Sequence, residues 1–455
     1  MGISKSLQDN AYRRISPTKI ILGGFLVIIL IGALLLMLPA ASATGKTTDF
    51  LSCMFTATSA TCVTGLTVFD TLSHWSGFGH IVILLLIQCG GLGFMVFAAL
   101  FSLVIHRRIS LRERLIMTQL FSVDELSGIV RLTKHILSRT LVIEGAGALL
   151  LAIRFIPDYG FGSGLFKSVF HSVSAFCNAG FDILGVGAGD IGSISKYVTD
   201  PLVCLTLVSL MVVGGLGFLV WENVLRAKKI RRFSFHTKLV LIMTASLLLF
   251  GTVMFFVFEY SNAATIGRMS FGEKLIASLF QSSTTRTAGF YSFSQGDMTV
   301  QSKLLSCFLM LIGGSPGSTA GGIKTVTFAV LILTAVSVMR GKNEISAMGR
   351  KISYYTVFKA IAVMMVGMFL AAVGGVIICQ TNGTPAVDSL FEAVSAFSTT
   401  GLSCGITAEL NSLSKIVLIL LMYFGRVGLL TLSIGLLAPR KPSKISYPEG
   451  KIIIG

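Results

Sequence analysis

The stretch SATCVTGLTV, residues Ser59–Val68, is small, rich in hydroxyl side chains and centred on Gly65. Long apolar runs lie on both sides of it, Ile20–Leu38 before and His80–Ile105 after. Non-helical backbone at membrane depth is tolerated only where protein or water satisfies its N–H and C=O groups. The stretch is therefore expected to line a polar feature buried inside a membrane protein.

The composition supports a membrane protein. The 455-residue chain is 53% hydrophobic and 13% charged, whereas soluble domains carry about 25% charged residues. The uncharged run Ile20–Leu38 can cross a hydrocarbon core of about 30 Å. No cleavable leader is expected, because Met1–Lys19 is polar and basic and no small-residue cleavage site follows the apolar run. We predict a multi-pass protein of the plasma membrane.

The formal charge of +17 is a topology signal. Lys and Arg gather in alternate segments between the apolar runs, which places these segments and both termini in the cytoplasm. The basic segments are 5–19, 107–139, 226–238, 340–359 and 440–451. Nucleic acid is not an expected partner. In the remaining loops acidic residues, among them Glu259 and Glu392, outnumber basic ones and are expected to concentrate cations at an outer mouth.

The opening motif has three relatives in the chain. They are SAFCNAGF (Ser174–Phe181), STTRTAGF (Ser283–Phe290) and SAFSTTGL (Ser395–Leu402), and in all four the serine precedes the glycine by six positions. Each motif follows an apolar run and an amphipathic segment of about a dozen residues, too short to span a bilayer, and precedes a second apolar run with a glycine-rich element in its middle.

These repeats predict an all-α membrane protein of four tandem helix–pore-helix–filter-loop–helix units. The fold would have eight transmembrane helices and four re-entrant half-helices around a pseudo-fourfold pore. The predicted repeats cover residues 20–108, 109–232, 233–343 and 344–438, with cytoplasmic segments at 1–19 and 439–455.

Four equivalent polar loops can surround an ion. A ring of backbone carbonyls can replace the hydration shell of potassium, and glycine reaches the positive φ that turns successive carbonyls the same way. Ordinary turn glycines would explain one such loop, but not four with the same offset. The predicted potassium-binding filter residues are Val63, Thr64, Gly65, Asn178, Ala179, Gly180, Thr287, Ala288, Gly289, Thr399, Thr400 and Gly401.

The chain resembles the Trk/Ktr/HKT superfamily of potassium transporters, and most closely the bacterial Ktr membrane subunit. The four motifs carry the resemblance, together with IQCGGLGFM, GGSPGSTAGGIKT, FGRVGLLT and the terminal ISYPEGKIIIG. It implies a pore within each subunit, a homodimer in the membrane and a cytoplasmic ring of nucleotide-binding regulatory subunits. Glycine at all four filter positions, by resemblance, favours potassium over sodium.

Two unusual features lie within the second apolar runs, and a third lies within the third motif. GGSPGSTAGG (Gly313–Gly322) cannot hold a regular helix, and the resemblance marks it as a mobile intramembrane gate. Arg426 interrupts an apolar helix and is either a cation that slows conduction or a structural cap on buried carbonyls. Arg286 is either a tether behind the filter or a conduction residue. The predicted gate residues are Gly313, Gly314, Ser315, Gly317, Gly321, Gly322, Lys324 and Arg426.

Channel-like potassium uptake is the leading functional prediction. The alternative is a sodium-coupled secondary cation transporter, which would need paired intramembrane carboxylates or inverted repeats; Glu144 is the one acid well inside an apolar run. An intramembrane enzyme is not expected, because no histidine lies mid-span beside a suitable serine. No covalent cofactor is expected; potassium is the transported ion and sodium a candidate activator.

Overall fold

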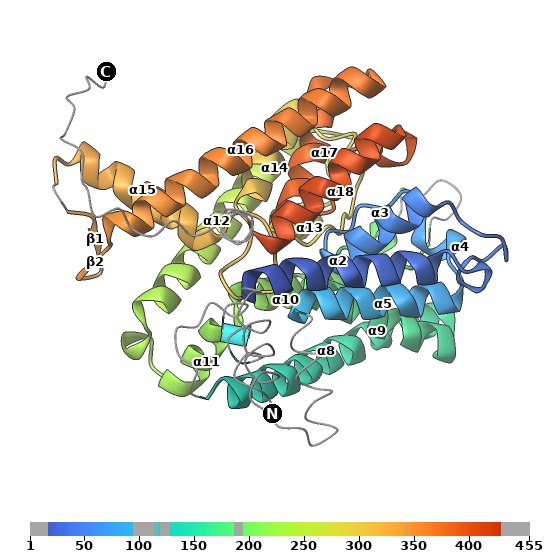
Figure 1. Ribbon diagram of the computed structural model, residues 1–455, viewed down its shortest axis with the longest axis horizontal. Coiled ribbons are helices and arrows are strands. Elements are labelled where there is room, and N and C mark those ends of the chain that lie inside the picture. Colours follow the sequence, from blue (N-terminus) through green and yellow to red (C-terminus); the bar gives the residue numbers. More distant parts are fainter. Residues whose placement is uncertain are drawn as a thin grey trace, which may run out of the picture.

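The computed structural model describes residues 17–93, 114, 117–118, 128–185, 194–342 and 344–428. The described chain is mostly helical (Figure 1). Its strands, β1 (Ser346–Ala347) and β2 (Arg350–Lys351), form a short antiparallel hairpin. The smaller helical elements are α4 (Thr71–His74), η1 (Pro39–Ala41), η2 (Ser195–Tyr197), η3 (Ile230–Arg232) and η4 (Thr407–Glu409).

Four long apolar helices lie at the outside. They are α2 (Pro17–Leu36), α8 (Ile129–Tyr159), α12 (Phe235–Glu259) and α16 (Tyr354–Asn382), and each is long and apolar enough to cross a membrane. Large apolar side chains on their outer faces are exposed, including Leu149 at 70% and Phe369 at 66%. Such a surface is stable only against lipid, so these faces are expected to contact the bilayer.

Four short helices precede the motif loops. They are α3 (Phe50–Thr61), α9 (Phe161–Cys177), α13 (Phe271–Thr284) and α17 (Ala386–Ser398), of 12, 17, 14 and 13 residues. Capping residues begin two of these helices. At the start of α3, Asp49 accepts a hydrogen bond from Ser52 N–H, and at the start of α13, Ser270 and Glu273 form a capping box. Their last turns are almost entirely buried, so all four end inside the protein.

Four inner helices follow the loops: α5 (Gly77–Leu92), α10 (Pro201–Leu216), α14 (Val300–Leu311) and α18 (Ser412–Val427). Three of them end at a glycine of the predicted element, Gly93, Gly217 or Gly428, with φ of 86°, 95° and 87°. Only glycine adopts this backbone readily, so it ends the helix.

The second apolar run of the second repeat is therefore not the continuous helix that the sequence predicts, whereas the third repeat has the break expected at Gly313–Gly322. After Gly217 the chain continues as α11 (Phe218–Ala227), bent by 94° from α10. After α14 a non-helical segment leads to α15 (Thr325–Met339). The chain that follows Gly93 and Gly428 lies outside the described residues.

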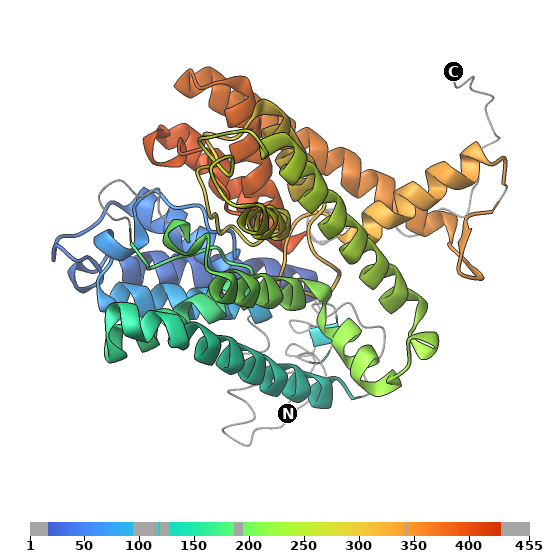
Figure 2. The same cartoon turned by 180° about the vertical axis from the view of Figure 1, so that it is seen from behind.

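The helices form four sets in chain order, α2–α3–α5, α8–α9–α10, α12–α13–α14 and α16–α17–α18, and each short helix packs with the outer helix of its set. The short helices α3, α9 and α17 also pack with the inner helix of their own set, whereas α13 packs with α10 of the second set. Figure 2, the view from behind, shows the first two sets in blue to green on one side and the fourth in orange to red above them. Within the described residues, four helices, or five with the bent pair α10–α11, qualify as spans by length and composition, so the eight-span repeat architecture stays a prediction.

Candidate functional site

The four motif loops share an unusual backbone. In each loop the residue two positions before the glycine has positive φ: 58° at Val63, 58° at Asn178, 69° at Thr287 and 54° at Thr399. The glycines follow with φ of 99°, 67°, 77° and 89° in the same order. Left-handed backbone is a strained outlier for β-branched residues, and three of the four are Val or Thr. Strain repeated four times persists only because the surrounding structure imposes it.

The loops also follow one another around a closed cycle. A Cβ added to Gly65 would lie 2.5 Å from Ala179 O, and one added to Gly180 would lie 2.7 Å from the Cα of Gly289. A Cβ on Gly289 would overlap the carbonyl of Thr400, and one on Gly401 would overlap that of Thr64. Each motif glycine thus faces backbone of the next loop, and the fourth loop returns to the first.

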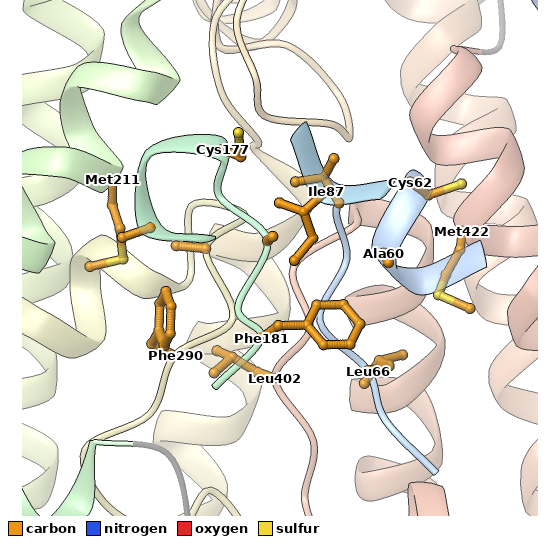
Figure 3. Close-up of a cluster of buried hydrophobic side chains, with 14 of the residues drawn as sticks. Ala60, Cys62, Leu66, Ile87, Cys177, Phe181, Met211, Phe290, Leu402 and Met422 are labelled. Atoms are coloured by element: carbon orange, nitrogen blue, oxygen red, sulfur yellow. The ribbon is translucent and has the colours of Figure 1, made fainter. Parts of the chain in front are cut away.

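Large buried apolar side chains pack beside the motif loops. Leu66, Phe181, Phe290 and Leu402 each directly follow a motif glycine, and all are at most 1% exposed. Figure 3 shows them beside the four neighbouring chain segments, with Ile87 and Met422 of the inner helices packed nearby. This tight packing fixes the positions of the loops.

The six-residue offset from serine to glycine has a structural cause. Ser59 Oγ accepts a hydrogen bond from Gly65 N–H at 3.0 Å, and Ser395 Oγ accepts one from Gly401 N–H at 3.1 Å. In the second loop Ser174 Oγ instead donates to Phe181 O at 2.8 Å. In the third loop Thr284 Oγ1, one position after the motif serine, donates to Phe290 O at 2.5 Å. The hydroxyls thus tie each loop to the end of its short helix.

The inner-helix glycines have a second role, which is close backbone approach. A Cβ on Gly90, Gly214 or Gly425 would overlap the carbonyl four positions before the filter glycine in the same repeat. These carbonyls belong to Thr61, Phe176 and Phe397. Small residues let two helix backbones approach this closely. The glycine-rich elements therefore hold the inner helices against the ends of the short helices.

Buried oxygen atoms without hydrogen-bond partners recur at one position of the loops. Asn178 Oδ1, Thr287 Oγ1 and Thr399 Oγ1 are buried with no hydrogen-bond partner in the described part of the chain. They occupy the same position in three loops, and Val63 occupies it in the first. Buried polar atoms are normally paired, so these oxygens are available to a ligand or to water.

The segment Gly313–Gly322 is held by neighbours rather than by its own helix. Gly313 N–H donates to Ile323 O at 2.8 Å, and Ser315 N–H donates to Gly215 O of α10 at 3.0 Å. Thr319 Oγ1 donates to Phe176 O and accepts from Asn178 Nδ2, both at 3.1 Å. The predicted gate therefore contacts the second motif loop directly.

The rest of the segment contacts the fourth motif loop. A Cβ on Gly321 would overlap Thr399 Oγ1, and one on Gly322 would lie 3.1 Å from Ser398 O. Gly317 O accepts from Phe218 N–H at 2.8 Å, and Gly314 packs against Ala320 within the segment. The segment thus lies between α10 and α17, against the predicted filter.

Arg426 bridges the segment to α5. Its guanidinium donates to Thr319 O, to Gly90 O and, at 3.1 Å, to Gly91 O. This geometry matches the carbonyl-capping alternative for Arg426. Lys324 also turns inward, and its Nζ donates to Ala320 O at 2.7 Å.

Arg286, in the third loop, is buried. Its guanidinium contacts Thr244 Oγ1 of the outer helix α12 at 3.5 Å, and its Nε has no partner in the described residues. The contact matches the tether alternative.

Two acids expected at an outer mouth are buried instead. Glu392 is 0% exposed and accepts hydrogen bonds from Ser403 Oγ, Thr407 Oγ1 and Cys404 N–H. Glu259 is also 0% exposed and accepts from Thr299 and Thr265. These two carboxylates fasten loops and do not face solvent.

Comparisons with known proteins identify the family of the chain. The model of the TrkH family, described as cation transport protein, matches residues 9–443. The chain is 39% identical over 455 residues to the potassium/sodium uptake protein NtpJ of Enterococcus hirae, covering 99% of each chain. It is 39% identical to the Ktr system potassium uptake protein B of Bacillus subtilis, covering 97% of each. The crystal structure of the potassium transporter TrkH from Vibrio parahaemolyticus has the same fold, with a TM-score of 0.70 at 19% identity, over 91% of this chain and 85% of that one.

Proposed function

The chain belongs to the TrkH family of cation transport proteins, and from this premise we propose that it takes up potassium across the plasma membrane through a channel-like pore. The observation that carries the proposal is the closed cycle of four loops, each with a left-handed residue two positions before a left-handed glycine. Alternating backbone of this kind turns successive carbonyls toward one side, where they can replace the hydration shell of an ion.

The proposed filter consists of the twelve residues predicted from the sequence, with potassium bound at their backbone carbonyls. The unpaired oxygens of Asn178, Thr287 and Thr399 support a further polar position beneath the glycines. The names of the relatives support the choice of ion, since both describe uptake of potassium and one also names sodium. In this proposal sodium acts as an activator.

The proposed gate is the segment Gly313–Gly322 with Lys324 and Arg426. Its contacts with Asn178 and Thr399 put it against the proposed filter, where a shift of the segment would open or occlude the path. A two-state segment can be biased by any partner that binds one state better. We place that control in cytoplasmic nucleotide-binding regulatory subunits acting on a membrane homodimer whose two termini are cytoplasmic.

Sodium-coupled secondary transport is the alternative function. It needs an intramembrane carboxylate site, and Glu144 is the acid to consider. Its carboxylate accepts hydrogen bonds from Gln88 Nε2 at 3.1 and 3.2 Å and lies 3.9 Å from Cys177 Sγ. These contacts favour a role in holding α5, α8 and α9 together, so the channel-like function ranks first.

Rubidium uptake into proteoliposomes tests the proposal. The purified chain is expected to carry rubidium down its gradient, with weak competition by sodium and caesium. Uptake that requires an opposing or parallel sodium gradient would favour the secondary transporter and contradict the channel-like function. A chain that is correctly folded yet admits neither ion, with regulatory subunits present, would contradict both.

A further inference from the structure

An apolar groove runs along the outside of the second helix set. Two adjoining hollows of about 520 and 640 Å³ form it, and they share Val142, Ile143 and Val213. Their walls come from α8, α10, α11 and α12. The lining is apolar along most of its length, with Ser138 and Arg139 at one end.

The break at Gly217 forms the end of the groove that α11 lines. Because α10 stops at Leu216 and α11 leaves at 94°, α10 no longer covers the first half of α8 (Figure 1). Trp221 Nε1 donates to Val213 O at 3.0 Å, so the indole satisfies a carbonyl near the break and closes the inner edge. The hollow at this end thus follows from the backbone turn, and the adjoining hollow lies between α8 and the straight part of α10.

The length of the groove fits one leaflet of a bilayer. Its lining on α8 runs from Ser138 to Leu150, which is about 18 Å at 1.5 Å per residue. Half of a 30 Å hydrocarbon core is about 15 Å. A lipid acyl chain is an occupant with this length, depth and chemistry.

The polar end of the groove is basic. Arg139 pairs with Glu222 at 2.5 Å, so these two charges offset each other. Lys134 is exposed one turn before Ser138 on the same face of α8. Immediately before the lining residue Phe233 the chain presents a further exposed basic run: Lys228, Lys229, Arg231 and Arg232. Basic residues at the end of a helix groove attract anionic headgroups.

We propose that this groove binds one phospholipid with an anionic headgroup. The acyl chain lies between α8 and the α10–α11 bend, and the phosphate lies among Lys134 and the basic run 228–232. The assignment to the cytoplasmic leaflet rests on the orientation given under the proposed function. The site itself rests on the groove and its charges.

A lipid in the groove would act on the proposed gate. Phe218 N–H, the first of α11, donates to Gly317 O, and a Cβ on Gly217 would lie 2.8 Å from Pro316 O. The α10–α11 junction is therefore fastened to the segment Gly313–Gly322. A lipid that fills the groove would hold α11 in place beside α8 and would stabilise one position of the segment Gly313–Gly322.

Native mass spectrometry of the detergent-purified full chain tests lipid binding without requiring transport. The probes are phosphatidylglycerol and phosphatidylcholine with identical acyl chains. Val142→Trp fills the groove, and Leu249→Trp is its control, because both positions are 68% exposed but Leu249 does not line the groove. Lys228→Gln with Lys229→Gln removes headgroup contacts, and Lys342→Gln is the control at an exposed lysine elsewhere.

The parent and both controls are expected to retain one phosphatidylglycerol in preference to phosphatidylcholine. Val142→Trp is expected to lose it at least tenfold, and the lysine double variant to weaken it about fivefold per charge. Equal retention by Val142→Trp and Leu249→Trp would overturn the proposal. So would equal retention of the two lipids by the parent, or a Val142→Trp variant that changes the monomer–dimer ratio while keeping its lipid. If Val142→Trp does not fold, the lysine variants decide the question.

Discussion

Replacement of Arg426 separates two physical explanations for a cation at this depth. The guanidinium donates to Thr319 O on the proposed gate and to the carbonyls of Gly90 and Gly91 on α5. If these bonds clamp the segment, any side chain that cannot make them should release it. If the charge alone slows cations, lysine should preserve the effect.

The magnitude follows from the bond to the gate. A hydrogen bond from a charged donor contributes about 1.5–3 kcal/mol, and only the bond to Thr319 O differs between a held and a released segment. Thr319 also keeps its bonds to Phe176 O and Asn178 Nδ2, so the lower value is the better guide. A change of about 1.4 kcal/mol shifts an equilibrium tenfold. Arg426→Ala is therefore expected to raise basal flux up to about tenfold.

The assay is rubidium uptake into proteoliposomes at matched protein density for the parent, Arg426→Ala and Arg426→Lys. The clamp predicts that Arg426→Lys is nearly as leaky as Arg426→Ala, because an ammonium group lacks the planar fork that reaches separate carbonyls. Potassium-over-sodium preference should be unchanged in both. Parental flux in Arg426→Lys together with raised flux in Arg426→Ala would refute the clamp and favour the electrostatic effect.

Two further predictions concern the inner helices. Gly425→Ala is expected to lower the melting temperature of the purified protein markedly, because the new methyl group overlaps a short-helix carbonyl. The control Gly23→Ala, on α2, has open space and should gain up to about 1 kcal/mol of stability. Equal melting temperatures for the two variants would refute the close-approach role. Deleting part of Ser315–Ala320 is expected to raise basal rubidium flux above that of Arg426→Ala and to leave ion preference intact. A deletion variant that reaches the membrane and conducts no faster than the parent would show that the segment is merely structural.

The motif loops could be predicted from the sequence because their shared geometry requires the same residue spacing in each repeat. The serine-to-glycine offset survives in all four motifs, and the bonds from Ser59 and Ser395 explain it in two. The short helices were predictable from their length and their polar ends. Family resemblance then supplied the ion, the partners and the gate, which spacing alone does not specify.

Other features of the structure have no recognisable pattern in the sequence. Nothing about Val63 or Thr287 signals a left-handed backbone, since β-branched residues avoid it; Asn178, which tolerates it, was the one available hint. The second runs contain several glycines, and sequence does not say that the helix stops at Gly217. The partners of Arg426 come from distant parts of the chain and meet only in the folded protein.

The burial of Glu259 and Glu392 could not be predicted for a related reason. Glu392 lies on a short amphipathic helix, and a helical pattern shows which residues share a face but not whether another loop covers it. The segment that covers it, around Ser403 and Thr407, follows the fourth motif and folds back onto α17. Its hydroxyls satisfy the carboxylate that would otherwise be costly to bury.

The ratio of potassium to sodium permeability in the four glycine variants tests the central claim most directly. Each of Gly65→Ser, Gly180→Ser, Gly289→Ser and Gly401→Ser adds a side chain that meets the next loop at a backbone angle unfavourable for serine. Uptake of rubidium and sodium is measured in proteoliposomes, with Gly145→Ser on α8, which has open space, as the control. A carbonyl filter predicts that preference for potassium falls in the filter variants and stays parental in Gly145→Ser. Parental preference in all four filter variants would contradict the claim that these loops select the ion.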